Sequence, residues 1–254
     1  MTWKSLKTVL ASLVAVALAA CSPTPSSGPE ATVTVFAAAS LTDALTEIAA
    51  DYERDEGTRV RLSFGASGAV ARQVEAGAPA DVVILADPIW MDRLAAAGRL
   101  DEQRFDLLAN SLVVIAPVDA AASQDVFEAL SGGGRLAIGT PESVPAGAYA
   151  RTWLQATGRW KAVQDRLVFA ADVRGVRAFV ARHEAALGIV YRSDVVGQDA
   201  VRIVLEPPPE EQPAIVYPAA GAADGGAEGR ALLDYLRTPR AAAIFRRHGF
   251  EPVA

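Results

Sequence analysis

The sequence predicts an α/β fold, because short runs of strand-forming residues alternate with stretches whose apolar residues recur at helical spacing. Alternation of this kind favours parallel sheets covered by helices on both faces. The composition agrees, since 51% of the residues are hydrophobic and 21% are charged, as expected of a globular protein with buried strands. The folded part is expected from residue 31 to residue 254, enough chain for one large or two small domains.

The predicted strands are short runs of apolar and β-branched residues, either continuous or alternating with polar ones. They are residues 32–36, 59–64, 82–85, 111–116, 136–139, 167–169, 187–191, 201–205 and 215–217. Pro117 directly follows the fourth run, and the glycines at 132–134 make a turn before the fifth. These breakers indicate where the fourth predicted strand ends and where the fifth begins.

The predicted helices have one apolar face, and many of them begin or end at proline or glycine. They are residues 41–54, 69–76, 88–97, 126–130, 147–157, 173–183, 228–236 and 241–248. Pro88 stands at a first helical position, which suits its fixed backbone angle, and Gly98 follows the same helix. No internal repeat is visible along the chain.

Residues 1–20 are predicted to be a signal peptide. Lys4 and Lys7 give a positive start, and the apolar run at 9–20 is too short to span a bilayer. Cys21 follows Leu-Ala-Ala and resembles the lipobox of bacterial lipoproteins, in which the cysteine becomes the lipid-bearing first residue. The alternative is a chance cysteine in an ordinary secretory signal. Residues 21–30 are rich in serine and proline and are expected to form a flexible, lipid-anchored tether.

The charge and the cysteine content exclude several classes of protein. Cys21 is the sole cysteine, so a disulfide within one chain is impossible. The net charge of −6 disfavours nucleic acid as a partner. The same sign means that an anionic ligand would have to be held by local donors, because the overall field repels it.

Four strand-to-helix junctions carry small or capping residues. Ser40 and Ser67 each precede a predicted helix, residues 144–147 place proline and small residues at another start, and Asp172 stands at an N-cap position. A helix N-terminus presents unpaired N–H groups and a positive dipole end, so several of them together can hold a dianion. Plain helix capping is the ordinary alternative at any one junction.

Seven segments, taken in order, make the chain resemble the family of periplasmic molybdate-binding proteins. They are residues 35–41, 71–81, 110–114, 144–147, 172–175, 187–191 and 248–250. The resemblance covers nearly the whole predicted folded region. It implies a two-lobed periplasmic-binding-protein fold, in which each lobe is a sheet flanked by helices and two crossing segments form the hinge. Residues 31–111 with 218–254 would form the first lobe, and residues 112–217 the second.

The resemblance also implies a set of ligand-binding residues. Ser40 and Ser67 would each offer a hydroxyl and a backbone N–H, Ala146 and Val173 would offer backbone N–H groups, and Tyr191 would offer its hydroxyl. Molybdenum would thus be held as molybdate through these donors, without a direct protein ligand to the metal and without a cofactor. Tyr191 ends an apolar strand, where a tyrosine is more often a packing residue.

One position departs from the family pattern. Relatives often have a serine after the third strand, where this chain has Leu85. The family's main donors do not depend on that position. The implied function is capture of molybdate, and of tungstate of nearly the same size, for delivery to the permease of an ABC transporter. We expect a monomer in the cell envelope, lipid-anchored to the membrane and facing the periplasm or the cell exterior.

A pocket made only of donors prefers fully deprotonated oxyanions. Hydrogen phosphate brings a proton that needs an acceptor, and a buried polar group left unpaired costs about 1–3 kcal/mol. Sulfate carries no proton, so a sulfate-binding protein remains an alternative. So does a small organic acid, for which Arg72, Arg151 or Arg174 could supply a bidentate partner, although a solvated helix face is the preferred interpretation of these arginines.

A serine hydrolase using Ser67 and His248 is the alternative from another class. Residues 65–69 come close to the Gly-x-Ser-x-Gly elbow, with alanine in the last place. The glycines at 132–134 follow the serine, however, and cannot form the early oxyanion loop. His183 and His248 both lie at helix ends, where capping histidines are common. We therefore expect a binding protein and no enzyme. A structural lipoprotein without a ligand cleft is a further alternative.

Overall fold

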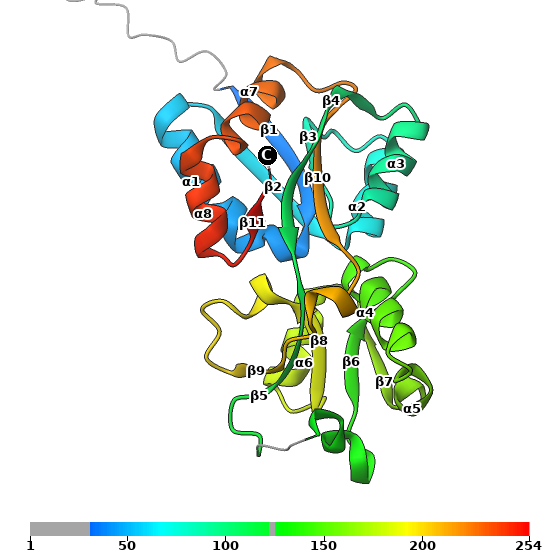
Figure 1. Cartoon of the computed structure of the whole chain (residues 1–254). Coiled ribbons are helices and arrows are strands. Elements are labelled where there is room, and N and C mark those ends of the chain that lie inside the picture. Colours follow the sequence, from blue (N-terminus) through cyan, green and yellow to red (C-terminus); the bar gives the residue numbers. More distant parts are fainter. Residues whose placement is uncertain (1–30, 122–124, 254) are drawn as a thin grey trace, which may run out of the picture. The chain divides into compact units, whose positions relative to one another are not determined.

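The computed structural model describes residues 31–121 and 125–253, whose strands form two mixed sheets flanked by helices (Figure 1). The predicted signal peptide, Cys21 and the tether lie outside the described residues. Each sheet with its helices is called a lobe below. No helix among the described residues is long and apolar enough to cross a membrane.

The first lobe contains a six-stranded sheet in the order β11-β4-β10-β3-β1-β2. Its strands are β1 (Thr32–Ala38), β2 (Arg59–Gly65), β3 (Val82–Ile84), β4 (Leu100–Asn110), β10 (Ile215–Ala222) and β11 (Glu251–Pro252). β1 pairs in parallel with β2 and β3, whereas β10 is antiparallel to both β3 and β4.

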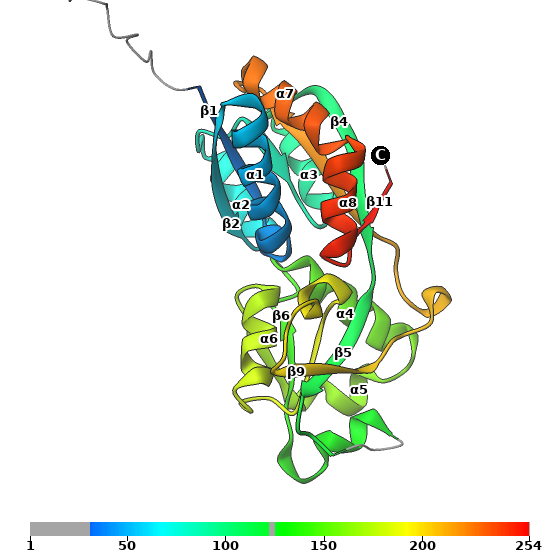
Figure 2. The ribbon, with the colours of Figure 1, turned by 90° about the vertical axis from the view of Figure 1, so that its left-hand side faces the viewer.

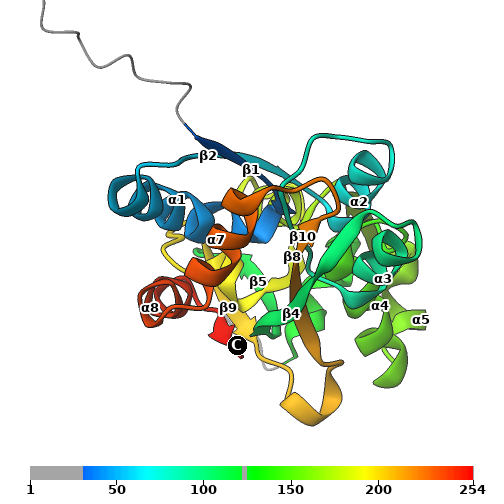
Figure 3. The same cartoon turned by 90° about the horizontal axis from the view of Figure 1, so that it is seen from above.

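Five helices cover this sheet from two sides. They are α1 (Thr42–Glu56), α2 (Ser67–Glu75), α3 (Pro88–Ala96), α7 (Ala227–Leu236) and α8 (Pro239–Arg247). In Figures 2 and 3, α1, α7 and α8 lie on one side of the sheet, and α2 and α3 lie on the other. The short 3-10 segment η1 (Ala39–Leu41) links β1 to α1.

The second lobe contains a five-stranded sheet in the order β7-β6-β8-β5-β9. Its strands are β5 (Leu112–Pro117), β6 (Leu136–Gly139), β7 (Leu167–Ala170), β8 (Leu187–Tyr191) and β9 (Val201–Leu205). Its helices are α4 (Pro145–Ala156), α5 (Trp160–Val163) and α6 (Val173–Ala181), joined by the 3-10 segments η2 (Val126–Gly133), η3 (Gln164–Arg166), η4 (Arg192–Val195) and η5 (Pro209–Glu211). Figure 2 shows α6 on one side of the sheet and α4 with α5 on the other.

Two segments cross between the lobes (Figure 1). β4 runs through Ser111 directly into β5, and the chain returns from β9 into β10. We propose the lobe division expected from the sequence, with residues 31–111 and 218–254 in the first lobe and residues 112–217 in the second. β10 begins its pairing with β4 at Ile215, inside the segment given to the second lobe, so this boundary falls within a shared strand.

Both sheets are mixed, so the expectation of parallel sheets holds for the pairs that β1 makes with β2 and β3 and that β6 makes with β7 and β8, but not for the other pairs. The sequence prediction also missed β4, although Phe105 and Leu107 alternate with Arg104 and Asp106 as a strand requires. β4 is a charged strand whose partner β10 lies about a hundred residues further along the chain. Parallel strands need a crossover connection, which is usually a helix. β4 passes into β5 without a helix between them, so no such connection forces β4 and β10 to pair in parallel.

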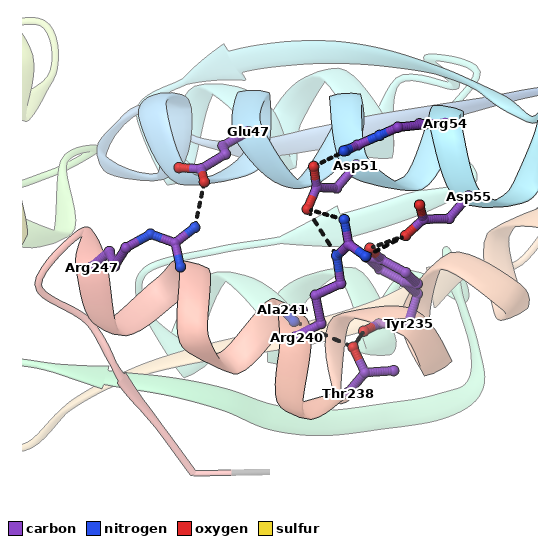
Figure 4. A network of polar contacts seen from close by, with 9 residues as sticks. All are labelled: Glu47, Asp51, Arg54, Asp55, Tyr235, Thr238, Arg240, Ala241 and Arg247. Carbon is purple, nitrogen blue, oxygen red and sulfur yellow. Dashed lines mark hydrogen bonds and ion pairs between the residues drawn. The ribbon is translucent and has the colours of Figure 1, made fainter.

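An ion-pair network links α8, the last helix, to α1 (Figure 4). Asp51 of α1 accepts from Arg240 of α8 at 2.9 Å, and Asp55 lies 3.1 Å from the same guanidinium. Glu47, one turn before Asp51, pairs with Arg247 at the other end of α8. The hydrogen bonds from Arg240 hold the pKa of Asp51 below its usual range. Exposed ion pairs contribute little to stability, so the buried apolar face of α8 supplies the main stabilisation.

Gly147 permits a close contact between the start of α4 and the end of β6. A Cβ atom there would lie 1.9 Å from the carbonyl oxygen of Gly139, at the end of β6. We therefore expect Gly147→Ala to push the start of α4 away from the sheet. Overpacking of this kind typically lowers the free energy of unfolding by about 1–3 kcal/mol, which urea titration would measure.

Gly226→Ala is the matched control, because the nearest atom to its new Cβ is the end of the flexible Glu228 side chain, at 3.1 Å. We expect a smaller effect there. Equal urea midpoints for the two variants would contradict the close packing assigned to Gly147.

Candidate functional site

A small pocket lies where strands of both sheets end and helices begin. The first lobe lines it with Ala38, Ala39, Ser40, Gly65, Ala66, Ser67 and Ala86, and the second lobe with Val144, Pro145, Ala146, Asp172, Val173 and Tyr191. All five residues expected to bind the ligand are therefore brought together. The cavity volume of this pocket is about 10 Å³. Sites for drug-sized organic ligands are usually larger, about 300–1,000 Å³, so this pocket suits a small ligand.

The two serines present their hydroxyls from the first lobe. Ser67 is 1% exposed and begins α2, after the parallel strand β2, and Ser40 is 7% exposed and follows β1. The Oγ of Ser67 accepts a hydrogen bond from the N–H of Ala86 at 3.0 Å. The Oγ of Ser40 lies 2.9 Å from the hydroxyl of Tyr217. Each serine oxygen is thus fixed in place by a neighbouring element of its own sheet.

The second lobe contributes two helix starts. Ala146 is the second residue of α4, directly after Pro145, and Val173 is the first residue of α6. Asp172 caps α6 by accepting from the N–H of Gly175 at 2.8 Å. The first N–H groups of a helix have no partner within the helix, and they lie at the positive end of its dipole. Two such ends therefore face the pocket with small side chains around them.

Tyr191 supplies the observation that most clearly indicates a ligand. Its side chain is 1% exposed, and its hydroxyl has no hydrogen-bond partner among the described residues. Burial raises the pKa of this hydroxyl well above its usual value, so it keeps its proton near neutral pH. A buried hydroxyl normally has a partner, because leaving one unpaired is costly. This donor therefore points to a hydrogen-bond acceptor that occupies the pocket.

The pocket has no cationic side chain in the part of its lining that the structure describes. No lysine or arginine is among the described residues that line it, and Asp172 is the acidic one. The arginines considered from the sequence have other partners: Arg72 lies over the Trp90 ring, Arg151 near Glu142, and Arg174 pairs with Asp43 at 2.9 Å. The expectation that these arginines serve helix faces fits this geometry.

Direct hydrogen bonds join the two lobes around the pocket. The N–H of Gly68, next to Ser67, donates to the carbonyl oxygen of Ser143 at 3.0 Å. The Arg174–Asp43 ion pair links α6 to α1, and the side-chain amide of Asn110 donates to Ser193 at 2.8 Å. The lobes are closed over the pocket, since its lining comes from both of them.

The geometry does not assemble a hydrolytic pair from Ser67 and His248. His248 lies at the end of α8, with its Nε2 2.8 Å from Glu47 of α1, and it is not among the residues that line the pocket. Ser67 is bonded to the backbone of Ala86. The serine and the histidine thus belong to different parts of the first lobe.

Two residues that the sequence did not single out belong to the surroundings of the site. Tyr217 in β10 contacts Ser40, and Asn110 at the end of β4 contacts Tyr217. Both lie in the crossing segments, where only strand pairing brings them near β1. A buried aromatic ending the predicted strand 215–217 was the available signal, but it did not distinguish a site residue from a core residue.

The family of bacterial extracellular solute-binding proteins matches residues 33–251. The chain belongs to this family. The family is one of solute-binding proteins, so the chain is a binding protein and the hydrolase alternative is not favoured.

Two relatives and one solved structure show where the chain lies within the family. A molybdate-binding protein ModA of Escherichia coli is 45% identical over 230 residues, covering 87% of this chain and 89% of the relative. A putative ABC transporter substrate-binding lipoprotein of Bacillus subtilis is 33% identical and covers 98% of both chains. The structure of the periplasmic molybdate-binding protein of Azotobacter vinelandii superimposes with a TM-score of 0.76 at 25% identity, covering 86% of this chain and 98% of that chain.

Asp194 gives the protein a pH-dependent stability that can be measured. Its carboxylate is buried in η4 and accepts from the N–H of Tyr191 at 3.1 Å. Burial raises its pKa to about 7, while the Tyr191 hydrogen bond and the charge of Arg177 act in the opposite direction. The native pKa therefore lies above the unfolded value of about 3.9.

Between these two pKa values the native state binds more protons than the unfolded state, so the free energy of unfolding falls as the pH rises. A single group contributes at most about 1.4 kcal/mol per pH unit. Asp194→Asn keeps an acceptor for Tyr191 and removes the titration. We expect the wild type to lose stability relative to this variant from about pH 4 to about pH 7, measured by urea unfolding at several pH values. If the difference in the free energy of unfolding between the wild type and Asp194→Asn stays constant over that pH range, the raised pKa of Asp194 is contradicted.

Proposed function

We propose that this protein captures molybdate, and tungstate, outside the cytoplasmic membrane and delivers it to an ABC transporter. The buried Tyr191 hydroxyl, without a partner in a pocket of other donors, is the observation that supports an oxyanion most directly. The relatives named for molybdate binding, at 45% identity in Escherichia coli and 38% in Haemophilus influenzae, support the choice of anion.

The proposed donors come from both lobes. Ser40 and Ser67 would give hydroxyl and backbone N–H groups from the first lobe, and Ala146, Val173 and Tyr191 would complete the shell from the second. Helix ends and hydroxyl dipoles can stabilise a dianion in a site closed to water, because few solvent molecules remain to compete with them. The metal centre is then reached only through its oxygen atoms.

Closure of the two lobes brings the proposed donors of both lobes around the ligand. A ligand that contacts both lobes stabilises the closed arrangement over an open one by its extra interactions. The crossing segments β4–β5 and β9–β10 are the proposed hinge, since they alone join the lobes covalently. Release to the transporter would then need only that the lobes separate.

Sulfate is the remaining inorganic candidate, and we favour molybdate over it. The chain resembles the sulfate-binding protein of Mycobacterium tuberculosis with a TM-score of 0.75 at 19% identity, which shows a shared fold. The more similar relatives are named for molybdate. An organic acid is disfavoured because Arg174, Arg151 and Arg72 are engaged outside the pocket.

We also propose that Cys21 bears a lipid and that residues 21–30 tether a monomeric binding domain to the membrane. The Bacillus subtilis relative, similar over 98% of both chains, is named as a lipoprotein, which supports an anchor of this kind. Labelling cells with a lipid precursor would test it. The wild type should incorporate the label, and Cys21→Ser should not.

Thermal melts test the proposed ligand. A ligand at about a thousand times its dissociation constant stabilises the folded state by about 4 kcal/mol, and each kcal/mol raises the midpoint of a chain of this size by about 2–4 °C. We expect molybdate and tungstate to raise the midpoint by about ten degrees, and sulfate and phosphate to change it little. Tyr191→Phe should reduce the rise while leaving the unliganded midpoint near that of the wild type. A flat response of the wild type to molybdate and tungstate would refute the proposed function.

Gly68→Ala tests closure. A Cβ atom there would lie 2.8 Å from the Ser143 carbonyl oxygen and 3.0 Å from its Cα, across the junction of the lobes. The other close atom, at 2.7 Å, is the end of the Trp90 side chain, which can move. We expect the variant to fold and its molybdate affinity, measured by calorimetry, to fall by at least about tenfold, which corresponds to about 1.4 kcal/mol.

Gly226→Ala, remote from the pocket in the loop before α7, is the control and should bind as the wild type does. Wild-type affinity in Gly68→Ala would show that binding does not require the lobe contact at this glycine.

A further inference from the structure

A chain of hydrogen bonds runs from the crossing segments to the pocket. The side-chain amide nitrogen of Asn110 lies 3.4 Å from the hydroxyl oxygen of Tyr217, which in turn lies 2.9 Å from the Oγ of Ser40. Asn110 ends β4, Tyr217 is in β10, and Ser40 lines the pocket. Tyr217 is fully buried, so these contacts are shielded from water.

The donor is defined at the Asn110 end of this chain. The amide oxygen of Asn110 accepts from the N–H of Ser111 at 2.8 Å, so its NH₂ group faces Tyr217 and Ser193 as a donor. The phenolic oxygen of Tyr217 therefore accepts from Asn110. Either oxygen of the Tyr217–Ser40 pair could donate, and donation by Tyr217 is the arrangement that leaves no buried phenolic proton without an acceptor. Ser40 then accepts from Tyr217, and its proton is left for the pocket.

The hydroxyl of Ser67 also has an oxygen that accepts and a proton free to donate, for a reason independent of Tyr217. Its oxygen accepts from the N–H of Ala86, a group that can only donate. The hydroxyl proton of Ser67 must therefore point elsewhere, and the pocket adjoins it. Together with the unpartnered hydroxyl of Tyr191, all three hydroxyls of the lining have their protons available to a ligand.

We propose that Tyr217 is a positioning residue that holds the Ser40 hydroxyl as a donor and so makes the site reject oxyanions that carry a proton. The inference rests on the proposed function, because it describes how the same pocket chooses among oxyanions. Without the proton from Tyr217, the Ser40 hydroxyl can rotate, and its oxygen can accept the proton of hydrogen phosphate. Tyr217 thus excludes protonated anions without touching them.

The substitution Tyr217→Phe removes one oxygen and keeps the packing. The ring of Tyr217 lies edge-on to Tyr191 at 5.7 Å between centroids and to Phe250 at 5.4 Å, and phenylalanine preserves both contacts. Tyr235→Phe is the matched control, since the hydroxyl of Tyr235 donates to the exposed Asp55, in the network of Figure 4, and does not line the pocket. Unliganded melts of the two variants establish that each is folded.

Calorimetric titration of the full chain with molybdate, sulfate and phosphate, at a pH where phosphate carries one proton, tests the proposal. In Tyr217→Phe we expect the preference for molybdate over hydrogen phosphate to fall about tenfold or more. The preference for molybdate over sulfate should change little, because neither anion has a proton. Tyr235→Phe should retain both wild-type preferences. An unchanged molybdate-to-phosphate ratio in Tyr217→Phe would overturn the inference.

The variant Ser40→Ala distinguishes an effect of Tyr217 through Ser40 from a direct effect of Tyr217 on the bound anion. Because Tyr217 acts through Ser40, adding Tyr217→Phe to Ser40→Ala should leave the molybdate-to-phosphate ratio of the single Ser40→Ala variant unchanged. An equal fall in both backgrounds would show that Tyr217 acts by another route and would overturn the inference. A wild type that binds none of the anions would instead refute the proposed function, whereas a wild type that binds molybdate keeps that function whatever the variants do.

Discussion

The rest of the structure depends on one constraint: a pocket without a cationic side chain must present hydrogen-bond donors whose directions are fixed before the ligand arrives. A dianion held by lysine or arginine would tolerate some disorder, because charge attraction has little directional preference. Neutral donors stabilise charge only when their N–H and O–H bonds point at it and water is excluded. The helix starts at Ala146 and Val173 meet this requirement through the backbone, which cannot turn away.

The remaining features of the site follow from the same constraint. Small residues line the helix starts, so backbone N–H groups can approach a small ligand closely. Gly68 lets the lobes touch beside Ser67, which excludes water from that side. Asp194, the buried acid next to Tyr191, has its pKa raised to about 7 by burial, so its negative charge is partly removed near neutral pH. A fully ionised carboxylate at that place would oppose an anionic ligand.

The crossing segments contain both the proposed hinge and two residues that lie next to the pocket. β4 and β10 link the lobes and also hold Asn110 and Tyr217, the two residues that we propose orient the Ser40 hydroxyl. Asn110 contacts Ser193 of the second lobe as well, so one side chain is bonded to both sides of the hinge. Closure and donor orientation therefore involve the same short stretch of two strands.

The sequence by itself determined the local structure of this protein. Most helices and strands follow from periodicity and breakers. The cap at Asp172 was predicted correctly because capping acts within a few residues, whereas Ser67 is the first residue of α2 and Ala66 is its N-cap. The resemblance to a known family then pointed to Tyr191. Tertiary structure alone decided the mixed sheets, the pairing of β4 with β10 and the chain of contacts from Asn110 to Ser40. These depend on pairing between β4 and β10, about a hundred residues apart, and the direction of a hydroxyl proton depends on neighbours that only this pairing brings together.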